Sequence, residues 1–409
     1  RLEGKGRALV ATAPIPAGSV IVQELPAVSL QHDASRSALR VCEQCLVPVG
    51  PVAGQLAWLA GVDDGDVPEV PGCPELPAAI ECPCGIAFCS VACQEAANEH
   101  HYLLCRDSPG ACVDDMNVVA LLVGAFLPAW CRLLNPEQEQ QTGGNNEVLM
   151  MMAKVVAIVA RRAGTMPTEE AAGQYLQLVR RPWWELVTDT EEEAAMVREV
   201  LEDTQGLLVR SPPPPSFLLG CKILLDTHGV TPDVRDAVTD VEFLGGIMGS
   251  FELNEISVDY PHPLRQPLED LDGDSPLLAA IKSAATDRIR ETLMGDEEDQ
   301  DEDEDEDAAP GEGSGAPEVF APDFAGVGLF PLLAILNHSC APNVTMEFEP
   351  PSGGLASAVA LRDIAAGEEL CHSYIELDGT TLESRAEALS HYGFKCACSR
   401  CVADKTTPE

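Results

Sequence analysis

Runs in which apolar and polar residues alternate lie near both ends of the chain. Such alternation is typical of strands that bury one face. It predicts strands over residues 7–13 and 20–24, joined by a turn at 15–18. A second group of strands and tight turns is expected over 319–376. Both ends of the chain are therefore expected to be built from short strands.

The middle of the chain has a helical pattern instead. Long runs of Ala, Leu, Val and Glu predict helices over 148–163 and 190–208, and the prolines at 212–215 interrupt the series. The apolar stretch 118–131 is too short to cross a membrane and contains Pro128. We interpret it as a buried helix and expect no transmembrane span.

Shorter elements complete the predicted order. Two short segments are expected around 243–258, and helical pieces near 277–294 and 382–391. Residues 48–80 are rich in Gly, Pro and Asp, which favours a loop.

Charge adds one further segment. The 409 residues carry a formal net charge of −42, and removing the 11 acidic groups of residues 296–307 still leaves −31. Because like charges repel and cannot be buried, we expect residues 296–316 to form a disordered surface loop. An acidic field of this size disfavours direct contact with nucleic acid or an anionic membrane, and it attracts a basic partner.

The cysteines indicate metal chemistry. Most of the 16 cysteines gather in clusters near histidines, which favours metal sites in a reducing compartment over disulfides. Eight candidate ligands in the first cluster suit two tetrahedral zinc ions with four ligands each. They form four closely spaced pairs: Cys42 and Cys45, Cys82 and Cys84, Cys89 and Cys93, and His101 and Cys105.

Two positions of this first cluster leave alternatives. Only Pro83 separates Cys82 from Cys84, so Cys73 is a second candidate for that ligand. His100 neighbours His101, although only His101 has the helical spacing to Cys105.

A second cluster lies near the C-terminal end. Cys396, Cys398 and Cys401 leave a tetrahedral zinc ion one ligand short, and Cys340 is the expected fourth ligand. The sequence thus predicts three zinc ions, all structural, because each has four protein ligands.

Several motifs around these cysteines resemble SET-domain methyltransferases. They are NHSCAPN at 337–343, GEEL at 367–370, SY at 373–374, YGF at 392–394, and GKGR at 4–7 with PAG at 16–18. Interruption of such a domain by a zinc module that resembles a MYND finger is similar to the SMYD-type subfamily. RPWW at 181–184 and FELN at 251–254 resemble its plant trithorax-related members.

The resemblance implies an α+β fold, in which a SET-domain β-fold of short strands carries an inserted MYND zinc finger, a helical SET-inserted segment and a post-SET zinc site. The implied parts are the N-terminal part of the SET domain (1–35), the MYND-type finger (42–105), the helical segment (113–240), a SET continuation with a helical piece (241–295), the acidic loop (296–316), the catalytic SET core (317–380) and the post-SET segment (381–409).

In the MYND family the ligand pairs interleave. Carried over, one ion takes Cys42, Cys45, Cys89 and Cys93, and the other takes Cys82, Cys84, His101 and Cys105.

The family's activity is transfer of a methyl group from S-adenosylmethionine to protein lysines. The resemblance implies Tyr374 and Tyr392 as catalytic residues. It implies as cofactor-binding residues Lys5, Gly6, Arg7, Ser250, Asn254, Asn337, His338, Tyr374 and Phe394. Gly249 stands where SMYD proteins have a cofactor-binding asparagine, and Asn254 is expected to compensate.

The expected substrate is a basic protein segment such as a histone H3 tail, and a Pro-rich peptide is the expected ligand of the finger. A monomer in the nucleus or the cytoplasm is expected, with no direct contact to nucleic acid or membrane. An inactive MYND-mediated binding scaffold is the alternative. A zinc hydrolase is disfavoured, since both cysteine clusters lack an open ligand position.

Overall fold

The computed structural model describes residues 6–36, 38–60, 70, 72–105, 143–188, 190–202, 225–226, 228–269, 279, 283, 323–348 and 354–406. The expectations for the buried helix 118–131, for the acidic loop 296–316 and for Lys5 lie outside these residues. So does nearly all of the helical piece 277–294. Within the described part, no helix has the length and apolar character needed to cross a membrane.

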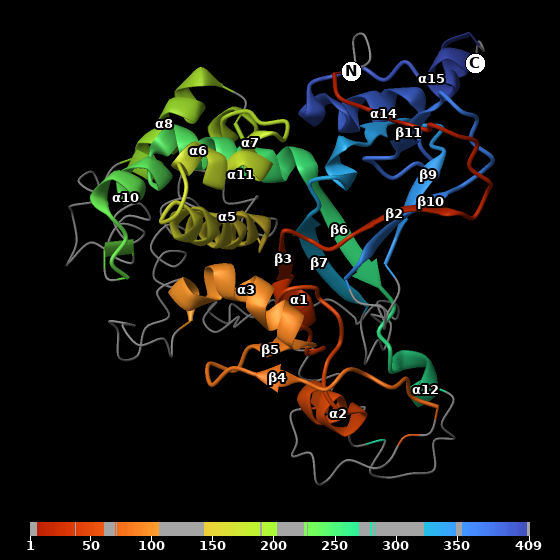
Figure 1. Ribbon diagram of the computed structural model, residues 1–409. Helices are drawn as coiled ribbons and strands as arrows, with labels where there is room; N and C mark the ends of the chain where they lie inside the picture. Colours follow the sequence, from red (N-terminus) through yellow and green to blue (C-terminus); the bar gives the residue numbers. More distant parts are fainter. Residues whose placement is uncertain are drawn as a thin grey trace, which may run out of the picture.

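Three small sheets bring the two ends of the chain together (Figure 1). Their strand orders are β1-β11-β8, β2-β10-β9 and β3-β7-β6. The strands are β1 (Leu9–Val10), β2 (Val20–Glu24), β3 (Val28–Gln31), β6 (Glu255–Tyr260), β7 (Phe324–Leu329), β8 (Asn337–His338), β9 (Val344–Glu347), β10 (Ala356–Ala360) and β11 (Glu369–His372). Each early strand pairs with a strand from beyond residue 320, so the residues between 32 and 323 are inserted between strands that pair with one another.

The first predicted strand is shorter than expected. Residues 7–13 contribute only β1, which pairs antiparallel with β11. Pro14 and Pro16 follow closely and have no N–H to donate to a ladder, so the chain turns away.

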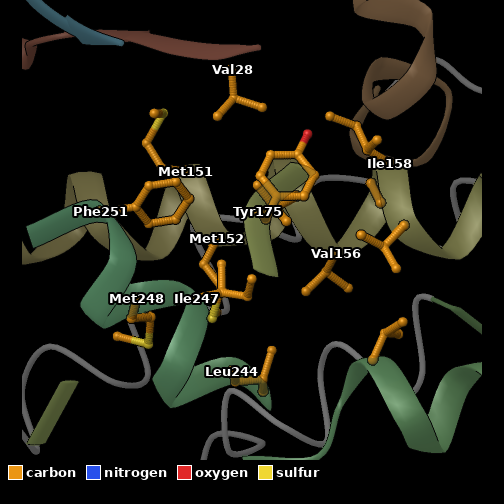
Figure 2. Close-up of a cluster of buried hydrophobic side chains, with 14 of the residues drawn as sticks. Val28, Met151, Met152, Val156, Ile158, Tyr175, Leu244, Ile247, Met248 and Phe251 are labelled. Carbon is orange, nitrogen blue, oxygen red and sulfur yellow. The ribbon is translucent and has the colours of Figure 1, made fainter. Parts of the chain in front are cut away.

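A helical layer packs beside the sheets. Its elements are α5 (Gly143–Arg162), α6 (Thr168–Ala171), α7 (Gly173–Leu176), the 3-10 turn η3 (Trp183–Glu185), α8 (Glu191–Glu202), α10 (Pro232–Val238) and α11 (Val241–Asn254). Figure 2 shows buried side chains of α5 facing those of α11, with Tyr175 among them. The second half of α5 is buried on nearly every side, which its continuous apolar sequence requires.

The two segments expected around 243–258 are the 14-residue helix α11 and the strand β6, which follows it directly. One prediction elsewhere needs correction. The loop expected over 48–80 contains a helix, α2 (Val52–Ala60). Tertiary contacts stabilise α2, because Leu56 is buried against Leu264 and Leu268.

A small cysteine-rich module follows the first sheet strands and lies below the helical layer in Figure 1. It contains α2, a hairpin of β4 (Ile80–Glu81) and β5 (Ala87–Phe88), and α3 (Val91–Leu104). The remaining elements are α1 (Asp33–Arg36), α12 (Arg265–Glu269), η4 (Leu333–Ile335), α14 (Leu382–Ala388), η5 (Ser390–Tyr392) and α15 (Ser399–Thr406).

Candidate functional site

Helix α3 organises two groups of ligand atoms. Its first turn carries Cys93, which meets Cys42, Cys45 and Cys89 in the first group. Its last turn carries His101, which meets Cys82, Cys84 and Cys105 in the second group. Within each group the candidate ligand atoms all lie within 4.8 Å of one another.

The distances suit tetrahedral zinc. Cys45 Sγ lies 3.6 Å from Cys89 Sγ, and Cys82 Sγ lies 3.7 Å from Cys105 Sγ. A tetrahedral ion with Zn–S bonds of about 2.3 Å separates its sulfurs by roughly 3.8 Å. The two groups also alternate along the chain, as the MYND resemblance implies.

The structure distinguishes the two ligand alternatives. Cys82 and His101 lie in the second group, with His101 Nε2 3.3 Å from Cys82 Sγ. Cys73 contacts the apolar cluster around Leu56 instead. His100 is buried, and its ring nitrogens have no hydrogen-bond partner among the described residues.

A third group closes the C-terminal segment onto the β-core. Cys340 follows β8 and meets Cys396, Cys398 and Cys401, with Cys401 Sγ 3.5 Å from Cys340 Sγ. The three groups therefore fit three zinc ions, each with four protein ligands.

A cavity of about 610 Å³ lies beside this third group. Strands β8 and β11, the end of α11 and the segment after η5 form its walls. The expected catalytic and cofactor-binding residues that line it are Gly6, Arg7, Asn254, Asn337, His338, Tyr374, Tyr392 and Phe394. Residues far apart in sequence thus converge on one concave surface.

Tyr374 is fixed at several points. Its backbone N–H donates to His338 Nδ1 at 3.0 Å, and its hydroxyl donates to the Leu336 carbonyl at 2.7 Å. Its ring lies 5.1 Å from that of Tyr392 and 6.3 Å from that of Phe394. Burial raises the pKa of Tyr374, so its phenol stays protonated at neutral pH.

The two asparagines of the NHSCAPN motif tie strands together. Asn337 donates through Nδ2 to the Arg7 carbonyl at 3.0 Å and to Glu369 at 2.8 Å. Asn343 accepts the backbone N–H of Cys371 at 2.8 Å and donates to the Glu369 carbonyl. These bonds link β11 to β8, to the residues just before β9 and, through Asn337, to the residues just before β1.

Close packing of helix α11 against the Arg181 backbone explains why position 249 is a glycine. A Cβ atom at Gly249 would lie only 1.9 Å from the Arg181 carbonyl oxygen, so no asparagine fits there. The Ser250 side chain is fully buried, donates to the Ile247 carbonyl and does not reach the cavity. Asn254 does reach it, and its Nδ2 donates to the carbonyls of Val179 and Ser250.

Several cavity residues had no role assigned to them from the sequence. Val179, which is 58% exposed, comes from the helical insertion. Arg362 and Glu368 form an ion pair at 2.5 Å, and hydrogen bonding from Arg362 lowers the pKa of Glu368 to about 2. Glu368 stands in the GEEL motif, whereas no local pattern indicates Val179.

Comparisons with known proteins agree with this arrangement. The sequence profile of the SET domain matches residues 6–375. The histone-lysine N-methyltransferase ATXR2 of Arabidopsis thaliana is 28% identical over 173 residues, which are 42% of this chain and 32% of that protein.

Two further histone-lysine N-methyltransferases match over 76 residues, or 19% of this chain. They are ASHR1 of Arabidopsis thaliana, 42% identical over 15% of its length, and SMYD3 of Homo sapiens, 43% identical over 17% of its length. The chain thus spans about a third or less of the length of these curated relatives. The predicted resemblance to SMYD-type SET proteins is confirmed. Because the profile match covers far more than half of its residues, the chain belongs to the SET domain family.

Proposed function

We propose that this protein methylates lysine side chains of proteins and uses S-adenosylmethionine as the methyl donor. The observation that carries the proposal is the position of Tyr374, whose hydroxyl and backbone are both fixed within an aromatic-lined cavity. The names of the matched relatives support the same activity. When bound, S-adenosylmethionine supplies a methyl group on a positively charged sulfur.

Tyr374 and Tyr392 are the proposed catalytic residues. Their rings, 5.1 Å apart and in contact with each other, would line one side of the channel that takes the substrate lysine and help to exclude water. An apolar enclosure lowers the pKa of an amine, so the lysine would lose its proton and become nucleophilic. Because the Tyr374 hydroxyl donates to Leu336, its oxygen lone pairs are held at one place in the cavity.

Residues along the β8 wall are proposed to hold the cofactor. Phe394 is 37% exposed and offers its ring to the adenine. Gly6 and Arg7 would approach the methionine part, and His338 would contribute its backbone. Because Asn337 Nδ2 is already engaged, its contact would come from the amide oxygen.

SMYD proteins have a cofactor-binding asparagine where this chain has Gly249, and we propose that Asn254 takes over that role. Both of its Nδ2 hydrogens have acceptors on the protein, which leaves the amide oxygen to serve the cofactor. Lys5 remains a proposed ligand outside the described residues. The part proposed for Ser250 is indirect, through its backbone carbonyl, which positions Asn254.

The substrate is proposed to be a basic segment, such as a histone H3 tail, since the net charge of −42 favours such a partner. The first two zinc groups are proposed to form a MYND finger that takes a Pro-rich peptide, and the third a post-SET site. We also propose the domain boundaries given in the sequence analysis, a monomeric state, and residence in the nucleus or cytoplasm. The intact cavity favours an enzyme over a binding scaffold.

Calorimetry with S-adenosylmethionine tests cofactor binding directly. The wild-type protein should bind in the micromolar range, and Phe394→Ala should bind about 5 to 150 times more weakly, because stacking contributes about 1–3 kcal/mol. Val402→Ala, a change at a similarly exposed apolar residue outside the cavity, is the control. No binding to wild-type protein with full zinc content would overturn the proposal.

A further inference from the structure

One arginine is buried beside the third cysteine group. The Arg385 side chain on α14 is 1% exposed, although guanidinium groups are rarely buried without compensating partners. Its Nη1 donates to the Thr380 carbonyl at 3.0 Å, and its Nη2 pairs with the half-exposed Asp404 on α15. One carboxylate and one carbonyl are few partners for a charge buried so completely.

The remaining partners are thiols. Nη2 of Arg385 lies 4.0 Å from Cys401 Sγ, and the guanidinium also interacts with Cys340. A zinc ion with four thiolate ligands carries a formal excess of about two negative charges. A buried cation at this distance stabilises such a group, because the low dielectric strengthens the attraction.

The same group supports the cavity. Cys340, Cys401 and Leu389 form a buried cluster, and Tyr374 and Tyr392 pack directly against it. Cys396 and Cys398 themselves line the cavity. A change in the charge on the third cysteine group would therefore shift the rings of Tyr374 and Tyr392.

We propose that Arg385 is a positioning residue for the third zinc site, acting as the buried counter-charge of its thiolates and so keeping the ion bound and the cavity wall in place. Outer partners of metal ligands typically change metal affinity by 10- to 100-fold. The proposal depends on zinc at this site and not on methyl transfer, so the two can fail separately.

The experiment measures zinc transfer from the intact protein to the chromogenic chelator 4-(2-pyridylazo)resorcinol. In Arg385→Met, one zinc ion should leave roughly 10- to 100-fold faster than in wild type. Cys398→Ser, which removes a ligand of the third group, should lack the same ion and so identifies it. Arg385→Gln keeps hydrogen-bonding capacity without charge and should behave like Arg385→Met. Arg385→Lys keeps the charge and should restore slow release.

Asp404→Asn is the matched control. It removes the carboxylate partner but leaves the guanidinium beside the thiolates, so zinc should leave at the wild-type rate. If zinc left Asp404→Asn as fast as Arg385→Met, Arg385 would act only through its ion pair with Asp404, which joins α14 to α15. That result would overturn the proposal. So would wild-type release from Arg385→Gln, which also covers the case in which Arg385→Met fails to fold.

Discussion

The imidazole of His338 links Tyr374 to the third cysteine group. Its Nδ1 accepts the backbone N–H of Tyr374 at 3.0 Å, and its Nε2 lies 3.2 Å from Cys340 Sγ. Because Nδ1 acts as an acceptor, the ring proton must be on Nε2, where it can be donated to the sulfur. Burial lowers the pKa of His338 to about 4, which keeps this tautomer neutral. The ring therefore orients the proposed catalytic tyrosine and a zinc ligand together.

Two substitutions separate these contacts. In His338→Asn the amide oxygen can replace Nδ1 and keep the Tyr374 N–H paired, whereas His338→Gln places its amide nearer to Cys340. We expect His338→Gln to lose more methyl-transfer activity, since an unpaired buried N–H costs about 1–3 kcal/mol. Turnover and zinc content should be measured for both. Equal turnover in the two variants would contradict the orienting role.

Gly249 should tolerate no side chain. The Cβ of Gly249→Ala would meet the Arg181 carbonyl at 1.9 Å, so the Arg181 backbone must shift, close to Val179 in the cavity wall. We expect a loss of about 2 kcal/mol in urea unfolding and weaker cofactor binding.

Gly246 in the same helix provides the control. A Cβ there has only ordinary contacts at 3.9 Å, with the Arg180 side chain. Gly246→Ala should be neutral or stabilise by about 0.5–1 kcal/mol, since alanine is the better helix former. If both variants unfold at the same urea concentration, close packing does not explain the glycine at 249.

These contacts mark the limit of what the sequence predicts. Ligand spacings and short motifs indicated Cys340, Tyr374 and Phe394, because such features can be recognised from residues that are close together in the sequence. The second-group ligands followed from spacing too, but choosing Cys82 over Cys73 required the fold.

Other features depend on segments that meet only after folding. Val179 reaches the cavity because Asn254, 75 residues away, holds its carbonyl. Ser250 lies one helical position from Gly249 but faces the core, and α2 depends on leucines some 200 residues later. No local periodicity contains this information.

A buried lysine should stabilise the contact between the helical layer and the first cysteine group. The Lys154 side chain is 3% exposed, and its Nζ lies 2.6 Å from both Glu43 Oε1 and the Ser29 carbonyl. Lys154→Met leaves these acceptors without their cation and should cost about 2 kcal/mol in chemical unfolding, a value discounted because Glu43 is partly exposed.

A double substitution checks the cause. Adding Glu43→Gln to Lys154→Met removes the uncompensated charge and should recover part of the loss. Arg40→Met, which breaks the exposed pair with Glu81, should cost less than about 1 kcal/mol. A double variant less stable than Lys154→Met alone argues against the ion pair.

His262 should make stability depend on pH. It is buried, Nδ1 accepts the Leu264 N–H, and Nε2 faces the Ala38 carbonyl. Burial lowers its pKa to about 4. Between pH 4 and 6.5 the unfolded chain then binds more protons than the folded one. As far as His262 is concerned, the free energy of unfolding is therefore highest above pH 6.5 and falls as the pH drops towards 4.

The integrated effect is about 3 kcal/mol. His262→Asn, which cannot titrate but can still accept the Leu264 N–H, should lose less stability than wild type between pH 7 and 5. Acid also affects the cysteine groups, but equally in both proteins, so this effect cancels when the free energy of unfolding of one protein is subtracted from that of the other at each pH. Parallel pH profiles would show that His262 does not titrate in this range.

Methyl transfer from labelled S-adenosylmethionine to core histones, nucleosomes and other basic proteins tests the central claim most directly. Wild-type protein should label a lysine, and Tyr374→Phe should lose at least 100-fold in rate, as expected when a fixed catalytic hydroxyl is removed. Tyr260→Phe is the control, because its buried hydroxyl also donates to a backbone carbonyl, at 2.6 Å, but lies outside the cavity. Label that persists in Tyr374→Phe, or no label with folded wild-type protein of full zinc content, would contradict the account.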